Sequence, residues 1–213
     1  GIGSFLGPRF LGFEKGMPWI ESRNPPPGWW RSALLFLAVG VLIFASFLIE
    51  AFWPRPGQVL RALAASTVIL GQMRVYRQPR MPGFLPQVLR WALVLIMTGL
   101  WALPFFPDHR VAVLHILFIG GFSLITLVVA TRVVFGHSGF EHLFQTRMIF
   151  VGLLGVFFTA ALVFRVMSDS HPQKFFFFLN VASLLWMTGG LVWAAIILPK
   201  LFFPRPEEDE EGS

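Results

Sequence analysis

The chain contains no cysteine, only one tyrosine and few charged residues. The lack of cysteine excludes disulfide bonds, thiolate metal sites and catalysis by a thiol. Charged residues make up 13% of the chain, whereas a soluble domain usually contains about a quarter. Phenylalanine is abundant, with 25 residues, which is typical of helices that face lipid and offer no partner to a hydroxyl group. These shortages favour a membrane protein over a soluble domain.

Long apolar segments dominate what the chain does contain. Hydrophobic residues make up 55% of the sequence, and the mean hydropathy is +0.69. A helix needs roughly 17–25 apolar residues to cross a bilayer. Six segments meet or approach this length: 32–53, 58–76, 85–106, 111–135, 148–167 and 175–198. We therefore expect an all-α fold, a polytopic transmembrane helix bundle of about six spans.

The second segment, 58–76, is the least apolar of the six. Polar residues interrupt it at five positions, which are Arg61, Ser66, Thr67, Gln72 and Arg74. Its apolar centre is therefore short, and we expect this helix to pack inside the bundle.

The remaining residues lie before and after the bundle. Residues 1–31 are rich in proline and are interpreted as a surface or juxtamembrane segment, residues 32–199 as the six-helix bundle, and residues 200–213 as an acidic cytoplasmic tail. The chain begins without methionine or a recognisable signal peptide, which we interpret as a fragment of a longer protein.

The distribution of lysine and arginine predicts the orientation, because basic residues accumulate on the cytoplasmic side of a membrane. With six spans both termini share one side, and that side receives most of the basic residues. The other side receives only Arg55, Arg61, Arg110, Arg165 and Lys174. We therefore expect cytoplasmic termini and a location in the bacterial inner membrane. The net charge of +6 then reflects topology, so no nucleic-acid partner is expected.

Two histidines stand near the ends of the fourth segment. An ionisable residue at membrane depth is costly, so each is a candidate functional residue. In a continuous helix His115 and His137 would lie roughly 33 Å apart and could not share one cofactor. Neutral imidazole ligates iron, copper and zinc, so we expect two separate sites. The other histidines lie in loops and are interpreted as solvated: His109, His142 and His171.

Each of the two histidines also has a structural interpretation. His115 could be a buried hydrogen-bonding group, and Gly120 and Gly121, which follow it, could serve the approach of another helix or of a flat macrocycle. His137 could simply offset the dipole at a helix end, because Gly136 and Gly139 beside it can terminate a helix. Both interpretations remain open at this stage.

The fourth segment carries a recognisable pattern. It contains His115, the pair Gly120-Gly121, the triplet Thr131-Arg132-Val133 and the sequence Gly136-His137-Ser138-Gly139. This pattern resembles the NnrS family of haem- and copper-containing membrane proteins linked to nitric oxide metabolism. The opening 3–9, Trp186, Pro199 and 204–206 add weaker support. Family members are longer, and the chain resembles their C-terminal half. It departs from them at Phe140, where members commonly have arginine.

The resemblance implies haem b and copper as cofactors. On that basis we expect His115 to be an axial haem ligand with Arg110 as a propionate partner, and His137 to be a second metal ligand beside Arg132. Catalytic residues are not identified. The expected partners are the lipid bilayer and either other membrane subunits or an N-terminal half with further ligands.

Two other classes of protein share the same bundle. A non-catalytic anchor of a respiratory complex could use the histidines as hydrogen-bond donors to a quinone. Half of a transporter would contain helices broken at glycine or proline, and only Gly120-Gly121 and Gly189-Gly190 fit that pattern. A visible absorption spectrum separates these classes, because a Soret band identifies haem.

Overall fold

A computed structural model of the chain describes residues 29–78, 83–140, 143–144 and 146–203. Within this part every regular element is a helix, so the expected all-α fold is confirmed. The elements are α3 (Trp29–Phe52), α4 (Pro54–Ser66), the π-helical η1 (Thr67–Gln72), α5 (Phe84–Ala102), the 3₁₀ turn η2 (Pro107–His109), α6 (Arg110–His115), the π-helical η3 (Ile116–Ser123), α7 (Leu124–His137), α8 (Ile149–Ser170), the 3₁₀ turn η5 (Pro172–Lys174) and α9 (Phe175–Phe202).

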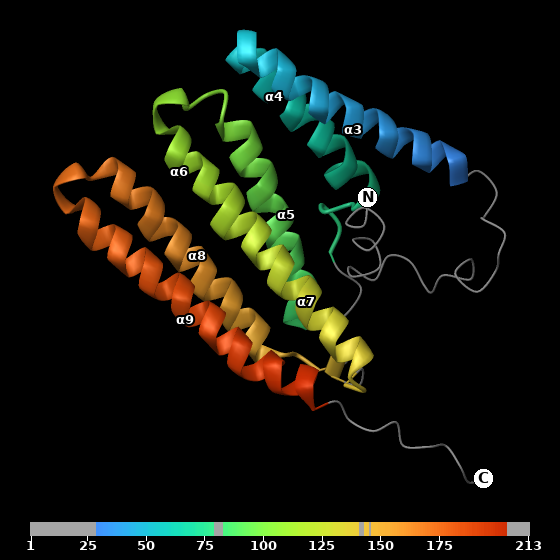
Figure 1. Cartoon of the computed structure of the whole chain (residues 1–213), viewed down its shortest axis with the longest axis vertical. Coiled ribbons are helices and arrows are strands. Elements are labelled where there is room, and N and C mark those ends of the chain that lie inside the picture. Colours follow the sequence, from blue (N-terminus) through green and yellow to red (C-terminus); the bar gives the residue numbers. More distant parts are fainter. Residues whose placement is uncertain (1–28, 79–82, 141–142, 145, 204–213) are drawn as a thin grey trace.

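The helices form neighbouring pairs along the molecule (Figure 1). Helices α3 and α4 pair at one edge, and α8 and α9 pair at the other. Helix α5 lies in the centre, where it contacts α4, α8 and the continuous helix formed by α6, η3 and α7. The second helix, α4 with η1, thus packs between α3 and α5, as its polar sequence predicted.

Five helical segments are long and apolar enough to cross a membrane: Ala33–Phe52, Phe84–Ala102, Pro107–His137, Ile149–Ser170 and Pro172–Phe202. The helix formed by α4 and η1 is not among them. Arg61 and the polar residues near its end keep it too polar, although it runs alongside the others (Figure 1). The chain is therefore a membrane protein, and its described residues form six helices, five of which qualify as spans on their own.

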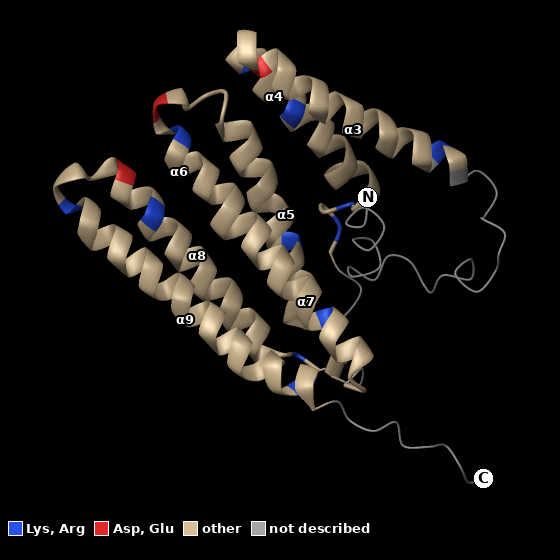
Figure 2. Cartoon of the chain, in the orientation of Figure 1, with Lys and Arg blue, Asp and Glu red and all other residues tan. Residues whose placement is uncertain are grey.

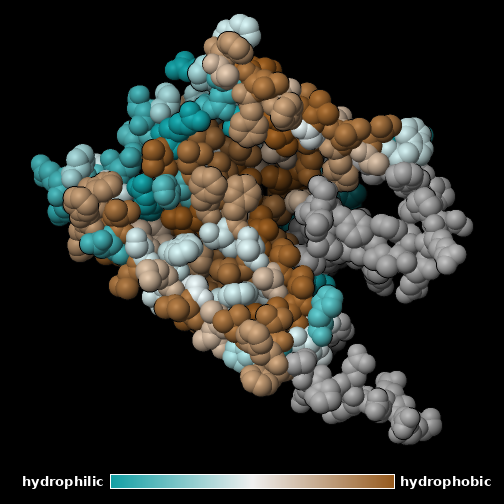
Figure 3. Space-filling model, viewed as in Figure 1, coloured by the Kyte–Doolittle hydropathy of each residue, from teal (hydrophilic) through white to brown (hydrophobic). Residues whose placement is uncertain are grey.

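The surface has the polarity that a bilayer requires. Charged residues gather toward the ends of the helices (Figure 2), while apolar side chains cover much of the visible face between them (Figure 3). Large apolar side chains remain exposed on this surface, among them Phe44, Phe176 and Leu191. In water such a surface would be unfavourable, whereas lipid tails solvate it without cost.

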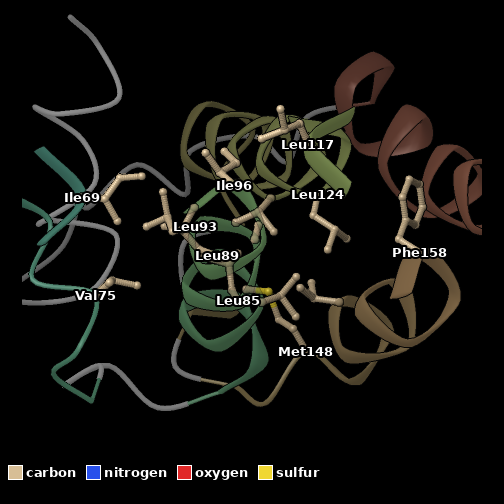
Figure 4. Close-up of a cluster of buried hydrophobic side chains, with 14 of the residues drawn as sticks. Ile69, Val75, Leu85, Leu89, Leu93, Ile96, Leu117, Leu124, Met148 and Phe158 are labelled. Carbon is tan, nitrogen blue, oxygen red and sulfur yellow. The ribbon is translucent and has the colours of Figure 1, made fainter. Parts of the chain in front are cut away.

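The buried core is centred on α5. Leu85, Leu89, Leu93 and Ile96 project from α5 into this core, where side chains from four other elements meet them (Figure 4). These partners are Ile69 of η1, Leu117 of η3, Leu124 of α7 and Phe158 of α8. Helix α5 thereby fixes the position of the helix that carries both candidate histidines.

Gly120 and Gly121 lie in η3, where the fourth helix packs closely on its neighbours. A Cβ atom at Gly120 would lie 2.8 Å from Leu95 Cδ1 of α5 and 2.9 Å from Leu162 Cδ2 of α8. A Cβ atom at Gly121 would collide with Ile96 of α5. Both glycines are buried in these helix contacts. The structure therefore favours the helix-packing interpretation of this pair over an approach to a macrocycle.

Helix α9 extends further than the sequence indicated. The sequence analysis ended this segment at residue 198, but the helix continues through Pro199 to Phe202. Lys200 Nζ donates a hydrogen bond of 3.4 Å to the Ile196 carbonyl. This carbonyl follows that of Ala195, whose usual N–H donor Pro199 lacks. Transmembrane helices tolerate such prolines.

Candidate functional site

His115 is the last residue of α6 and lies immediately before the π-helical η3. Its side chain is half-buried, and Nδ1 lies 2.7 Å from the Val111 carbonyl oxygen one turn earlier. A carbonyl only accepts hydrogen bonds, so Nδ1 must carry the proton and donate it. In the neutral ring Nε2 then keeps its lone pair. A hydrogen bond of this kind fixes the tautomer of a metal-ligating histidine.

The His115 ring opens onto a groove of about 430 Å³ between the fourth helix, α8 and α9. Most of its lining is apolar or aromatic, with few polar groups, which is typical of cofactor pockets. Besides His115 the lining residues are Phe118, Ile119, Ser123, Arg165, Leu179, Ala182, Ser183, Trp186 and Met187. We call this cavity the His115 groove.

Arg165 of α8 is the cation in the His115 groove, and the sequence analysis did not select it. Its Nη1 donates a hydrogen bond of 2.8 Å to Ser168 Oγ, and the guanidinium carries further N–H donors. It is the only charged residue in the fifth apolar segment, 148–167, and that isolation was the available signal. The positive charge places an anion-binding group beside His115.

Arg110 lines a different cavity from His115. Its Nη2 donates a hydrogen bond of 3.0 Å to Glu50 Oε1, and Gln58 Nε2 donates one of 3.2 Å to the same oxygen. Arg61 pairs with the other carboxylate oxygen of Glu50. Arg110 therefore joins the α3–α4 pair to the start of α6. Its role as a propionate partner stays a prediction.

His137 is the last residue of α7, and its exposed ring donates a 2.9 Å hydrogen bond from Nδ1 to the Val133 carbonyl. The chain then turns at Gly139, whose φ is +73°. The Phe140 N–H bonds the Phe135 carbonyl at 3.0 Å, and the two rings lie 6.1 Å apart. This is a Schellman motif with its apolar contact. Phe140, the residue that departs from the family pattern, thus closes the helix end.

Arg132 stacks against an aromatic ring, since its guanidinium carbon lies 4.9 Å from the centre of the Phe144 ring. His137 lies one and a half turns further along α7, at the helix end. His142, which the sequence analysis interpreted as a solvated loop histidine, lies outside the described residues. The Nε2 atom of His137 keeps its lone pair for the same reason as that of His115.

The two histidines lie toward opposite ends of one continuous helix. Elements α6, η3 and α7 follow one another without interruption (Figure 1), so the chain does not fold back at Gly120-Gly121. Across the described residues, no three side chains among His, Asp and Glu come together in a way that could hold a metal ion. Any metal at His115 or His137 would need other donors.

The loop histidines make local contacts at one end of the molecule. His109 is exposed, and its Nδ1 lies 2.6 Å from Asp169 Oδ2. His171 donates from Nδ1 to the Met167 carbonyl at 3.1 Å, and its ring meets the edge of Phe178 at 5.5 Å. The first contact joins η2 to the end of α8, and the second joins the end of α8 to α9.

Comparison with known proteins places the chain in a family. No curated protein and no solved structure matches it. A model of the NnrS protein family matches residues 9–205, which is most of the chain. The match includes every described helix and both candidate histidines. The chain therefore belongs to the NnrS family and is an NnrS-type membrane protein linked to nitric oxide.

Proposed function

We propose that the protein binds haem b in the His115 groove, with His115 Nε2 as an axial ligand of the iron. The proposal rests above all on one observation. Within the apolar groove, Nδ1 of His115 donates to the Val111 carbonyl, and in the neutral ring this leaves the Nε2 lone pair for a ligand. An unpaired imidazole nitrogen in apolar surroundings is unfavourable unless a ligand or hydrogen bond satisfies it.

The other residues of the His115 groove suit the same cofactor. Phe118, Leu179 and Trp186 offer apolar and aromatic contacts of the kind that a porphyrin ring requires. Arg165 would pair with a propionate, a role that the sequence analysis gave to Arg110. If His115 held the haem there, the iron would supply a site for binding a diatomic gas such as nitric oxide.

We assign copper to the opposite end of the helix, at His137. Imidazole is a favoured copper ligand, and the His137 ring is exposed and fixed by its bond to Val133. Further ligands would come from other membrane subunits or from an N-terminal half. Arg132 would act as the electrostatic neighbour of this site. The protein would carry out both roles in the bacterial inner membrane with its termini in the cytoplasm.

The test compares His115→Ala with His137→Ala in the purified protein. Both rings donate from Nδ1 to a carbonyl one turn earlier, so the two variants remove equivalent local bonds. We expect His115→Ala to lose the Soret band, and His137→Ala to keep the band and lose bound copper. Visible spectra and metal analysis of the same samples measure both outcomes.

A His115→Ala protein with a full Soret band would contradict the haem assignment. A wild-type protein without any Soret band would contradict it too. That result would favour the alternative function as a non-catalytic membrane anchor. If His137→Ala changed the haem spectrum as strongly as His115→Ala, the two-site proposal would be wrong.

A further inference from the structure

A second cavity, of about 450 Å³, lies between the α3–α4 turn and the α5–α6 turn. Both turns lie at the same end of the molecule (Figure 1). The cavity is distinct from the His115 groove, and its lining residues are Trp53, Pro54, Arg55, Pro56, Gln58, Leu103, Pro107 and Arg110. We call it the Arg55–Arg110 cavity.

The Arg55–Arg110 cavity has an excess of positive charge. Arg55 and Arg110 line it, and none of the lining residues is acidic. Glu50 contacts Arg110 from beside the cavity, but the same carboxylate also pairs with Arg61. Arg55 forms no ion pair with any residue in the part of the chain that the structure describes. Glu50 thus pairs with Arg61 and Arg110 and leaves Arg55 without a carboxylate partner among the described residues, which favours an anionic ligand.

Both arginines have donors left for such a ligand. Arg110 uses one N–H of Nη2 for Glu50, and a guanidinium has five N–H donors in total. Its side chain is 57% exposed despite the contact with Glu50, so the remaining donors are accessible. Guanidinium groups bind phosphate oxygens through paired hydrogen bonds.

The surroundings of the cavity match the headgroup level of a membrane. Exposed aromatic side chains flank both turns: Phe52 and Trp53 at the first, Phe105 and Phe106 at the second. Aromatic residues concentrate at the interface between lipid tails and water. The apolar flanks of the helices, along which acyl chains would lie, extend away from this end (Figure 3).

We propose that the Arg55–Arg110 cavity binds the phosphate headgroup of an anionic phospholipid, with both arginines as its ligands. The lining combines cationic groups with Trp53, Leu103 and three prolines, which suits an amphiphile better than a free ion. This site is independent of the haem and copper proposals. It adds a specific lipid to the bilayer that surrounds the protein.

The experiment titrates the purified full chain, in a non-ionic detergent, with dioleoylphosphatidylglycerol and with dioleoylphosphatidylcholine. Native mass spectrometry counts the protein–lipid complexes. We expect preferential binding of phosphatidylglycerol. Arg55→Gln should weaken it about fivefold, and Arg55→Gln with Arg110→Gln about 30-fold, because each basic residue near an anionic lipid contributes about one such factor.

Lys174→Gln is the matched control. Lys174 is an exposed cation in η5, at the same end of the molecule and outside the cavity lining. We expect this variant to bind phosphatidylglycerol as the wild type does. Arg55 has no ion partner among the described residues, so Arg55→Gln tests the site without disturbing Glu50.

Four results would overturn the proposal. The first is equal binding of the two lipids. The second is an equal loss of binding in Lys174→Gln and Arg55→Gln. The third is displacement of the lipid by millimolar inorganic phosphate, which would assign the cavity to the free ion. Unchanged lipid binding with a lowered haem content in the double variant would also overturn it, in favour of a haem propionate.

Discussion

At the scale of single residues, three tryptophans form hydrogen bonds between helices. Three indole N–H groups donate to hydroxyl groups on other helices: Trp193 to Thr131 at 2.9 Å, Trp91 to Thr159 at 3.0 Å and Trp101 to Ser66 at 3.0 Å. Indole N–H groups require a partner where water is absent. Thr131 belongs to the sequence Thr131-Arg132-Val133, so one residue of the family pattern is explained by packing against α9.

Replacing Thr131 by valine should destabilise the protein. Thr131 is fully buried, and valine keeps its shape while leaving the Trp193 N–H without an acceptor. We expect a loss of about 1 kcal/mol in the free energy of unfolding. Thr98→Val is the control, because exposed Thr98 bonds only the Val94 carbonyl of its own helix. Unfolding in mixed micelles measures both, and equal stabilities of the two variants would contradict the role given to this bond.

The candidate ligands could be found from the sequence, but their surroundings could not. His115 and His137 stood out because an imidazole in an apolar segment is rare. The groove beside His115 depends on how α8 and α9 pack against the fourth helix, and sequence periodicity does not predict that packing. Arg165 was therefore not predicted as a residue of this site, and Arg110 was predicted as the propionate partner because it is near His115 in the sequence.

At the scale of helices, the α3–α4 pair depends on one glycine. A Cβ atom at Gly57 would lie 2.6 Å from both the Glu50 nitrogen and the Ser46 carbonyl oxygen of α3. Backbone atoms cannot move aside as a side chain can. The two helices can approach this closely, and Glu50 can meet Arg61, only because residue 57 has no side chain.

We expect Gly57→Ala to push α3 away from α4 and to lower the free energy of unfolding by about 1–3 kcal/mol, the usual cost of overpacking. Gly40→Ala on the same helix pair is the control, since no atom lies within 4 Å of the Cβ position there. Thermal unfolding in detergent compares the two. A Gly57→Ala protein as stable as Gly40→Ala would show that the helices accommodate the methyl group.

The helices themselves were predictable, whereas their irregular parts were not. The apolar segments located five spans because hydropathy and length decide which helices can cross a bilayer. The π-helical segments η1 and η3 have no signature in the apolar pattern. In η3 the Ser123 hydroxyl donates to the Phe118 carbonyl at 2.8 Å, so the wider turn satisfies part of its own backbone.

At the scale of the whole molecule, the described helices alternate in direction. Because six of them follow one another in the described residues, the start of α3 and the end of α9 lie on the same side of the bundle (Figure 1). The basic residues of the sequence predict that this side is cytoplasmic. That orientation would leave the Arg55–Arg110 cavity at the opposite face.

Reporter fusions test this orientation. We expect green fluorescent protein fused after Ser213 to fluoresce and alkaline phosphatase at the same position to remain inactive, because the phosphatase requires the periplasm. A phosphatase inserted into the η5 turn at Gln173 should show the reverse and serves as the internal control. Active phosphatase after Ser213 would invert the topology.

The pairing of Glu50 with Arg61 also bears on how the protein enters its membrane. A single arginine in the middle of an inserting helix costs about 2.5–3.5 kcal/mol, and α4 has too little apolar surface to offset this. The carboxylate that neutralises Arg61 lies on α3, directly before the turn. During biogenesis α3 would therefore have to remain at the insertion machinery until α4 has been synthesised. The two helices would then leave it for the lipid phase together, as one helical hairpin.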